Sequence, residues 1–307
     1  MKAQLVVKKF GHLLKESFTG FMADNGLKLS ASLSYYTIFA LPPLLIIIMF
    51  LCGIFFGNVA VNGELFSQIN TLVGDTAALQ IQQIIKNIKL SDSNTFVAVI
   101  GVIILIIGAS GVFAEIQDSI NIIWGIKAKP KHGLIKFVIN RLMTFSMIAS
   151  VGFLLLVGLI INSLLVLLNK NLAAYFPKDI IYLFYVINTI IVFIIITILF
   201  TLIFKSLPDG KVALRDCIIG ASFTAFLFMI GKFAIGAYIR STAIASIYGA
   251  AGSLILILAW IYYSAIILYF GTEFTKVYAH THGDKIIPND NTIIILNPNS
   301  EVEEKKI

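Results

Sequence analysis

Long apolar stretches are the feature of this chain that most constrains its fold. Six of them alternate with short charged segments along the 307 residues. A helix of about 20 apolar residues crosses the hydrocarbon core of a bilayer and satisfies its own backbone hydrogen bonds there. We therefore expect an all-α, polytopic membrane helix bundle of about six transmembrane helices plus amphipathic surface helices. The expected spans cover about residues 33–56, 95–124, 138–168, 180–204, 212–238 and 247–276.

The composition supports the same class. Hydrophobic residues make up 58% of the chain and charged residues 13%, whereas soluble domains are about half apolar and about a quarter charged. The net charge of +7 lies mostly in short segments beside apolar stretches, which indicates orientation and contact with lipid headgroups rather than nucleic-acid binding. Cys52 and Cys217 lie in or beside apolar stretches, as buried free thiols do.

The Lys and Arg residues predict how the bundle is oriented. If the N-terminus is cytoplasmic, 17 of these 23 residues fall in segments on that side, five fall on the opposite side, and Lys232 lies within a span. Cytoplasmic loops of membrane proteins carry such an excess of positive charge. We therefore expect a multi-pass protein with both termini in the cytoplasm.

The two ends of the chain differ from its apolar middle, residues 31–279, which we expect to form the transmembrane domain. Residues 1–30 are a basic cytoplasmic segment, and residues 280–307 are a polar cytoplasmic tail that we expect to be disordered. Apolar residues recur at helical spacing in the first segment, which fits a helix on the membrane surface and a helix packed on the bundle equally well. They are Phe10, Leu13, Leu14, Phe18 and Phe21.

Charged residues within the expected spans are few, and most fall at one depth. Glu115 and Asp118 are three residues apart and share a helix face near the cytoplasmic end of the second span. A charge within a span is costly unless it is paired or hydrated, which favours a buried ionic network. The alternative is an interfacial ring of charges that only anchors the bundle. The candidate residues at this depth are Glu115, Asp118, Asn121, Arg141, Arg215, Glu273, Tyr35 and Tyr36.

Two further features suggest function within the spans. Lys232 falls in the outer half of the fifth span, where it either lines a hydrated cavity for an anionic group or extends its ammonium to the interface. Pro42 and Pro43 remove two backbone donors near the middle of the first span, which predicts a kink or a local break. Close helix packing is expected at Gly108, Gly111, Gly249 and Gly252.

Enzyme signatures are missing from the sequence. Its four histidines do not combine with Cys or acidic residues at metal-ligand spacing, and the sequence has neither a P-loop nor a GxSxG nucleophile elbow. We therefore expect no catalytic residues, no metal and no other cofactor. Any transport would draw on an ion gradient rather than on an ATPase within the chain.

Four segments resemble the YihY/BrkB family of bacterial inner-membrane proteins. They run from Ala31 to Leu44, from Gly111 to Trp124, from Leu207 to Ala221 and from Ile247 to Glu273, and the resemblance covers about residues 15–279. Pro42 departs from the family pattern, which usually has another residue before a single proline. Thr272 stands where the family has alanine in a Gly-Ala-Glu motif, whereas the acid of that motif is kept as Glu273.

The resemblance implies a six-span protein of the bacterial inner membrane. Some relatives have carried the label ribonuclease BN, but the acidic metal ligands and basic groove of a nuclease are missing, so ribonuclease activity is not expected. Others are associated with virulence, serum resistance and envelope lipid export. We therefore expect a transporter or flippase-like exporter of an amphipathic or anionic, lipid-like envelope molecule, with membrane lipids as partners. The alternative is a non-transporting membrane scaffold for envelope assembly.

Overall fold

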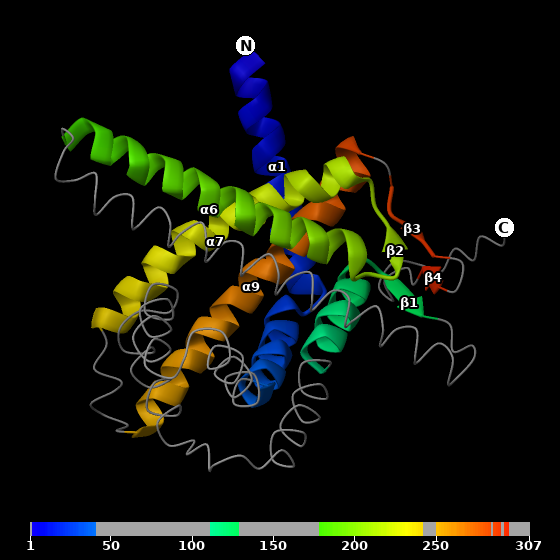
Figure 1. Cartoon of the computed structure of the whole chain (residues 1–307). Coiled ribbons are helices and arrows are strands. Elements are labelled where there is room, and N and C mark those ends of the chain that lie inside the picture. The colour runs from blue at the N-terminus through cyan, green and yellow to red at the C-terminus, as the bar shows by residue number, and fades with distance from the viewer. Residues whose placement is uncertain are drawn as a thin grey trace, which may run out of the picture. The chain divides into compact units, whose positions relative to one another are not determined.

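The chain is mostly helical in the residues that the computed structural model describes, which are 2–40, 111–128, 178–241, 250–283, 285–289 and 292–294 (Figure 1). The named helices are α1 (Lys2–Ala23), α6 (Lys178–Ser206), α7 (Leu214–Ser241) and α9 (Ala250–His282), and residues 26–40 and 111–123 are also helical. The chain divides into two compact parts. Met1–Leu27, Gln117–Met229 and Ile267–Ile307 form the first, and Lys28–Ile116 and Ile230–Ile266 form the second.

Three of the described helices are long and apolar enough to cross a bilayer. Their apolar windows are Thr189–Ser206, Leu214–Gly231 and Ile257–His282, with mean hydropathies of 2.5, 1.5 and 1.4. They correspond to the predicted fourth, fifth and sixth spans, which confirms the expected class of helical membrane protein. The number of six spans remains a prediction, because most of the first three predicted spans lie outside the described residues.

In the first part, α7 and α9 pack through a reciprocal contact of glycine and threonine. Both helices carry the spacing Gly-x-x-x-Thr, with Gly220 and Thr224 on α7 and Gly271 and Thr275 on α9. A Cβ atom on Gly220 would overlap with Thr275 Oγ1, and one on Gly271 would overlap with Thr224 Oγ1. The helices are antiparallel, because rising numbers on α7 meet falling numbers on α9. Small residues at these positions allow the two backbones to approach closely.

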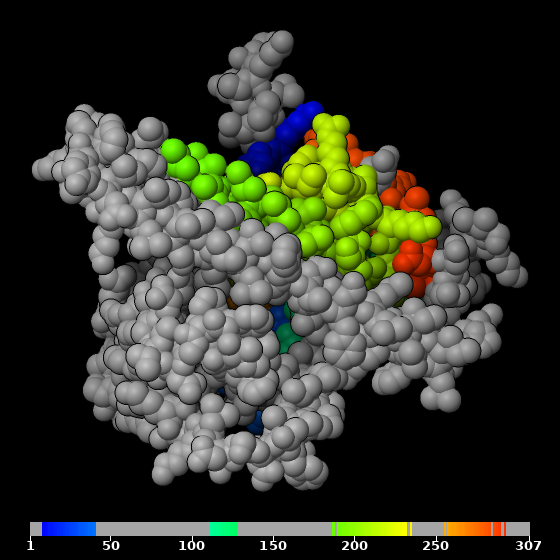
Figure 2. Space-filling view, in the orientation of Figure 1, coloured from blue at the N-terminus to red at the C-terminus, as the bar shows by residue number. Residues whose placement is uncertain are grey.

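α6 presents an apolar face at the surface and a second face to protein. Four isoleucines at helical spacing are exposed: Ile187, Ile190, Ile194 and Ile198. Towards the end of the helix Phe200 and Phe204 are buried, and the Phe200 ring lies 6.1 Å from the ring of Phe228 on α7. Figure 2 shows the surface of α6 in green. An exposed apolar stripe of this kind is what a helix presents to lipid tails.

α1 packs on α7 and α9 by one face. Leu13, Ser17 and Phe21 are buried on that face. The Phe21 ring lies 5.9 Å from Phe270 of α9, and the Phe10 ring lies 6.4 Å from Phe223 of α7. The sequence allows α1 either to lie on the membrane surface or to pack on the bundle. One face of α1 does pack on the bundle.

Two short antiparallel strand pairs tie the segment after α9 to two loops (Figure 1). The strands are β1 (Ile126–Ala128), β2 (Gly210–Lys211), β3 (Ile287–Pro288) and β4 (Thr292–Ile294). β1 pairs with β4, with Lys127 opposite Ile293, and β2 pairs with β3, with Gly210 opposite Pro288. β1 follows the helix over 111–123, and β2 lies between α6 and α7.

These strands lie in part of the tail that the sequence predicts to be disordered. The tail is polar and carries no long apolar pattern of its own, so its sequence gives no sign of order. It becomes ordered because the two loops supply backbone partners, and because Ile286 and Thr292 are buried there. Residues 295–307 of the tail lie outside the described residues.

Candidate functional site

A buried cluster of two carboxylates and one ammonium joins α1 to α9. Lys276 Nζ lies 3.1 Å from Asp24 Oδ2 and 3.1 Å from Glu273 Oε1. The Glu273 side chain is 2% exposed and the Asp24 side chain 10%, whereas the Lys276 side chain remains 25% exposed. We call Asp24, Glu273 and Lys276 the ion cluster.

The end of α1 places Asp24 in this cluster. The helix ends at Ala23, and a two-residue turn follows in which Asn25 has a φ of 56°, in the left-handed region that Asn tolerates well. One turn earlier, Gly20 lies directly against Glu273, because a Cβ atom there would overlap with Glu273 Oε1. The absence of a side chain at Gly20 thus allows the carboxyl group to fit beneath α1.

The charges in the ion cluster do not cancel. With all three groups ionised, two carboxylates face one ammonium, which leaves one net negative charge among groups that have little contact with water. Burying a charge costs free energy unless a partner compensates it. A cluster of this kind can therefore hold a further cation, and a proton is the smallest. No group of three or more metal-ligating side chains occurs among the described residues.

A second group of polar contacts, which we call the loop clasp, holds the strand-bearing segments together. Asn121 Nδ2 donates to Asp209 Oδ2 over 3.0 Å, and the backbone N–H of Asp209 donates to Asn121 Oδ1 over 2.9 Å. The carbonyl of Asp209 accepts from the N–H of Asn289 and from Thr292 Oγ1. The loop between α6 and α7 is therefore bonded both to the helix over 111–123 and to the tail.

Trp124 links the loop clasp to the ion cluster. It lies at the end of the same helical segment as Asn121, and its Nε1 donates to the carbonyl oxygen of Thr272 over 3.3 Å. Thr272 is the neighbour of Glu273 and is itself fully buried. Hydrogen bonds of this helical segment therefore reach both the loop and the α9 backbone beside the ion cluster.

Replacing Asn121 with alanine is expected to loosen the loop clasp. Two hydrogen bonds are lost and Asp209 keeps a partly buried oxygen without its donor, which costs about 1–3 kcal/mol. Backbone amide exchange in residues 286–294 should accelerate, as measured by hydrogen–deuterium exchange on the full chain in detergent. Thr281→Ala removes an exposed hydroxyl at the end of α9 and serves as the control. Equal exchange in both variants would show that Asn121 does not hold the tail.

The structure places two of the predicted site residues in the groups described above. Glu273 belongs to the ion cluster and Asn121 to the loop clasp. Arg215 is exposed in the first turn of α7, Asp118 is exposed, and Glu115 is half-buried. In the second part, Tyr35 and Tyr36 are exposed, their rings lie 6.1 Å apart, and Gly111 lies against Tyr36.

The remaining predicted residues are not described at the level of their side chains. Lys232 and Gly252 lie within α7 and α9, without a description of their surroundings. Pro42, Pro43, Gly108, Arg141 and Gly249 lie outside the described residues. The place of Arg141 in the expected ionic network and the expected break at the two prolines therefore stay predictions.

Sequence reasoning did not single out Asp24, Asp209 or Lys276. For Lys276 a signal existed, because it follows Glu273 by three residues and so shares its helix face. For Asp209 the signal was its place in the Leu-Pro-Asp segment of the family resemblance. Asp24 offered none, since its neighbours in the chain do not reveal that α1 ends against α9.

Comparison with known proteins places these features in a family. The family profile described as "Virulence factor BrkB" matches residues 17–292. A UPF0761 membrane protein of Saccharophagus degradans is 26% identical over 278 residues, covering 89% of this chain and 61% of that protein. A protein of the same name from Teredinibacter turnerae is 25% identical over 92% of this chain and 64% of its own length.

Another relative matches over most of its own length. The UPF0761 membrane protein MS0032 of Mannheimia succiniciproducens is 25% identical, covering 89% of this chain and 92% of that protein. The chain spans less than two thirds of the first relatives above, 61% and 64% of their lengths. No solved structure matches the chain. Because the family profile covers residues 17–292, from the last part of α1 to the start of β4, this membrane protein belongs to the virulence factor BrkB family.

Proposed function

We propose that this protein is an inner-membrane transporter, flippase-like in action, that exports an amphipathic or anionic lipid-like envelope molecule and is driven by an ion gradient. The observation that carries the proposal is the ion cluster. Glu273 lies within an apolar helix that is long enough to span the membrane, and it is buried with one cation shared between two acids. Ionisable groups at membrane depth are costly and mark ion or substrate pathways in many membrane proteins.

The ion cluster has the properties that ion coupling requires. It gains or loses one charge when a proton binds or leaves, and that change alters the balance of forces between α1 and α9. The hydrogen bonds through Thr272, Trp124 and Asn121 connect this balance to the loop clasp. Local charge changes of this kind drive larger rearrangements where a packed interface has two stable arrangements.

A lipid-like substrate fits the remaining features of the described residues. The exposed isoleucine stripe of α6 offers an apolar surface to acyl chains, whereas Glu273 of the ion cluster is buried. The chain has no P-loop, so a gradient rather than ATP is the energy source in this proposal. Export of envelope lipid also agrees with what the family resemblance implies.

The proposal is tested by lipid movement in proteoliposomes. Full-length protein is reconstituted with fluorescent NBD-phosphatidylglycerol, a proton gradient is imposed, and dithionite quenching reports the NBD lipid in the outer leaflet over time. We expect faster movement than in protein-free vesicles, dependent on the gradient. In Glu273→Gln the initial rate should fall by about tenfold or more, because the cluster loses the charge that binds the ion.

Glu16→Gln is the matched control, since it removes a carboxylate from an exposed pair with His12 on α1. Its rate should equal that of the unmodified protein. A monodisperse elution profile of Glu273→Gln excludes misfolding as the cause of a lower rate. Movement equal to that in protein-free vesicles would contradict the transport proposal and favour the alternative of a non-transporting scaffold.

A further inference from the structure

α1 crosses α7 and α9 steeply instead of running along them. Phe10 contacts Phe274, and Phe21 contacts Phe270. The first residues of these pairs are about 16 Å apart along α1, whereas their partners are only about 6 Å apart along α9. Phe270 and Phe274 lie in the last part of the apolar window Ile257–His282. A helix that crosses a membrane span steeply near its end lies close to the plane of the membrane surface.

The face of α1 that does not pack on the bundle has two unlike flanks. On one flank five exposed residues at spacings of three, four and seven form a stripe: Lys8, Gly11, Lys15, Phe18 and Met22. On the other flank the exposed or half-exposed residues are Lys9, His12, Glu16 and Ala23. The first flank alone carries large apolar side chains, since Phe18 is 55% exposed and Met22 is 47% exposed. We call it the lysine–phenylalanine flank.

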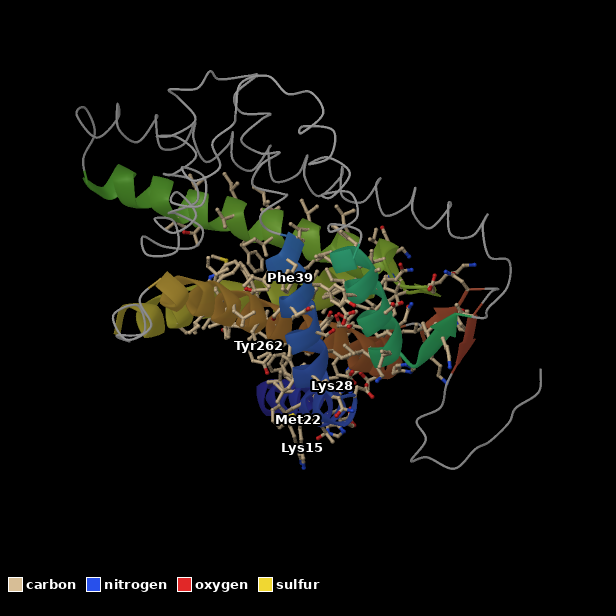
Figure 3. All side chains as sticks on the ribbon, turned by 90° about the horizontal axis from the view of Figure 1, so that it is seen from below. Lys15, Met22, Lys28, Phe39 and Tyr262 are labelled. Carbon is tan, nitrogen blue, oxygen red and sulfur yellow. The ribbon has the colours of Figure 1, made fainter. Side chains whose placement is uncertain are left out.

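From this geometry we propose that the lysine–phenylalanine flank lies in the headgroup region of the bilayer and binds anionic phospholipids. Phe18 and Met22 enter the boundary of the acyl chains, while Lys8 and Lys15 extend to the phosphate groups. Lys15 and Met22 project from the same side of α1 (Figure 3). Amphipathic helices bind membranes in this way, through apolar burial on one side and attraction of lysines to anionic lipid on the other.

Charge complementarity favours lipid over a second protein as the occupant. Two lysines in the flank have no acidic neighbour within it, and their long apolar stems suit the membrane interface. Gly11 leaves open space in the middle of the stripe, because a Cβ atom added there would have no other atom within 4 Å. Lipid headgroups adapt to such a gap, whereas a protein partner would need a complementary side chain.

The test measures the immersion of the flank in the full-length protein. Cys52 and Cys217 are replaced by alanine, and a nitroxide label is placed at Met22→Cys or at the neighbouring Ala23→Cys. Both positions are exposed, but they lie on different flanks. In proteoliposomes we expect the label at 22 to be accessible to oxygen and shielded from a water-soluble nickel reagent, and the label at 23 to show the reverse.

The lysines are tested by changing the lipid. With phosphatidylglycerol added to phosphatidylcholine, immersion at residue 22 should increase, and Lys15→Gln should abolish the increase. Lys9→Gln removes the same charge from the opposite flank, so the increase in immersion at residue 22 should remain in this variant. Equal nickel access at residues 22 and 23, or shielding of residue 22 from both reagents as at a protein contact, would overturn the proposal. If Lys9→Gln and Lys15→Gln changed the immersion of residue 22 equally, the assignment of Lys15 as the residue that contacts the phosphate groups would be overturned.

Discussion

Replacing Lys276 with methionine is expected to lower the melting temperature of the protein in detergent by roughly 5–10 °C. Methionine keeps most of the apolar stem but removes the charge, which leaves Asp24 and Glu273 as two buried carboxylates without a cation. Removing one partner from a buried ion pair costs about 3–5 kcal/mol. The lower end of that range applies, because a quarter of the Lys276 side chain is exposed. The measurement is loss of the monodisperse elution peak after heating.

A double variant distinguishes the ion cluster from a general packing defect. Adding Glu273→Gln to Lys276→Met removes one of the stranded charges, so the melting temperature should recover in part. Glu16→Gln, which disrupts an exposed pair, should leave it unchanged. A Lys276→Met protein as stable as the original would show that the two carboxylates are not held by this lysine.

Replacing Gly220 or Gly271 with alanine is expected to destabilise the protein, although alanine is the better helix former. In an open helix this change stabilises by about 1 kcal/mol. Here each new methyl group would overlap with a threonine on the facing helix, and forcing groups into a packed contact costs about 1–3 kcal/mol at each site. Both threonines are held in place by hydrogen bonds to their own helix, Thr224 to Gly220 and Thr275 to Gly271.

Gly11 provides the matched control for this experiment. It lies in a helix as well, but nothing lies within 4 Å of its Cβ position. Gly11→Ala should therefore leave the melting temperature unchanged or raise it, whereas Gly220→Ala and Gly271→Ala should each lower it by several degrees. The double variant should have a lower melting temperature than either single variant, because both changes push α7 away from α9. Stability gains at all three glycines would contradict the packing described for these helices.

The sequence by itself determined the class of the protein and the approximate limits of three of its helices. The predicted spans 180–204, 212–238 and 247–276 correspond to α6, α7 and α9 with shifts of a few residues at most ends. The agreement has a physical cause: in lipid, a long apolar segment must satisfy its backbone internally, and a helix does so whatever its neighbours are. The end of α9 was the least predictable, because the helix continues to His282 through polar residues, and its last three residues are exposed.

Only the tertiary structure shows which polar groups contact one another. Nothing near Asp24 in the chain indicates that it faces Lys276, because the contact depends on how α1 crosses α9. The strands β3 and β4 likewise form only where the loops at β1 and β2 offer backbone partners, so the local composition favours disorder and the fold overrides it. Apolar length is a property of a segment, whereas an ion pair or a strand pair is a property of two segments, and their meeting is set by packing.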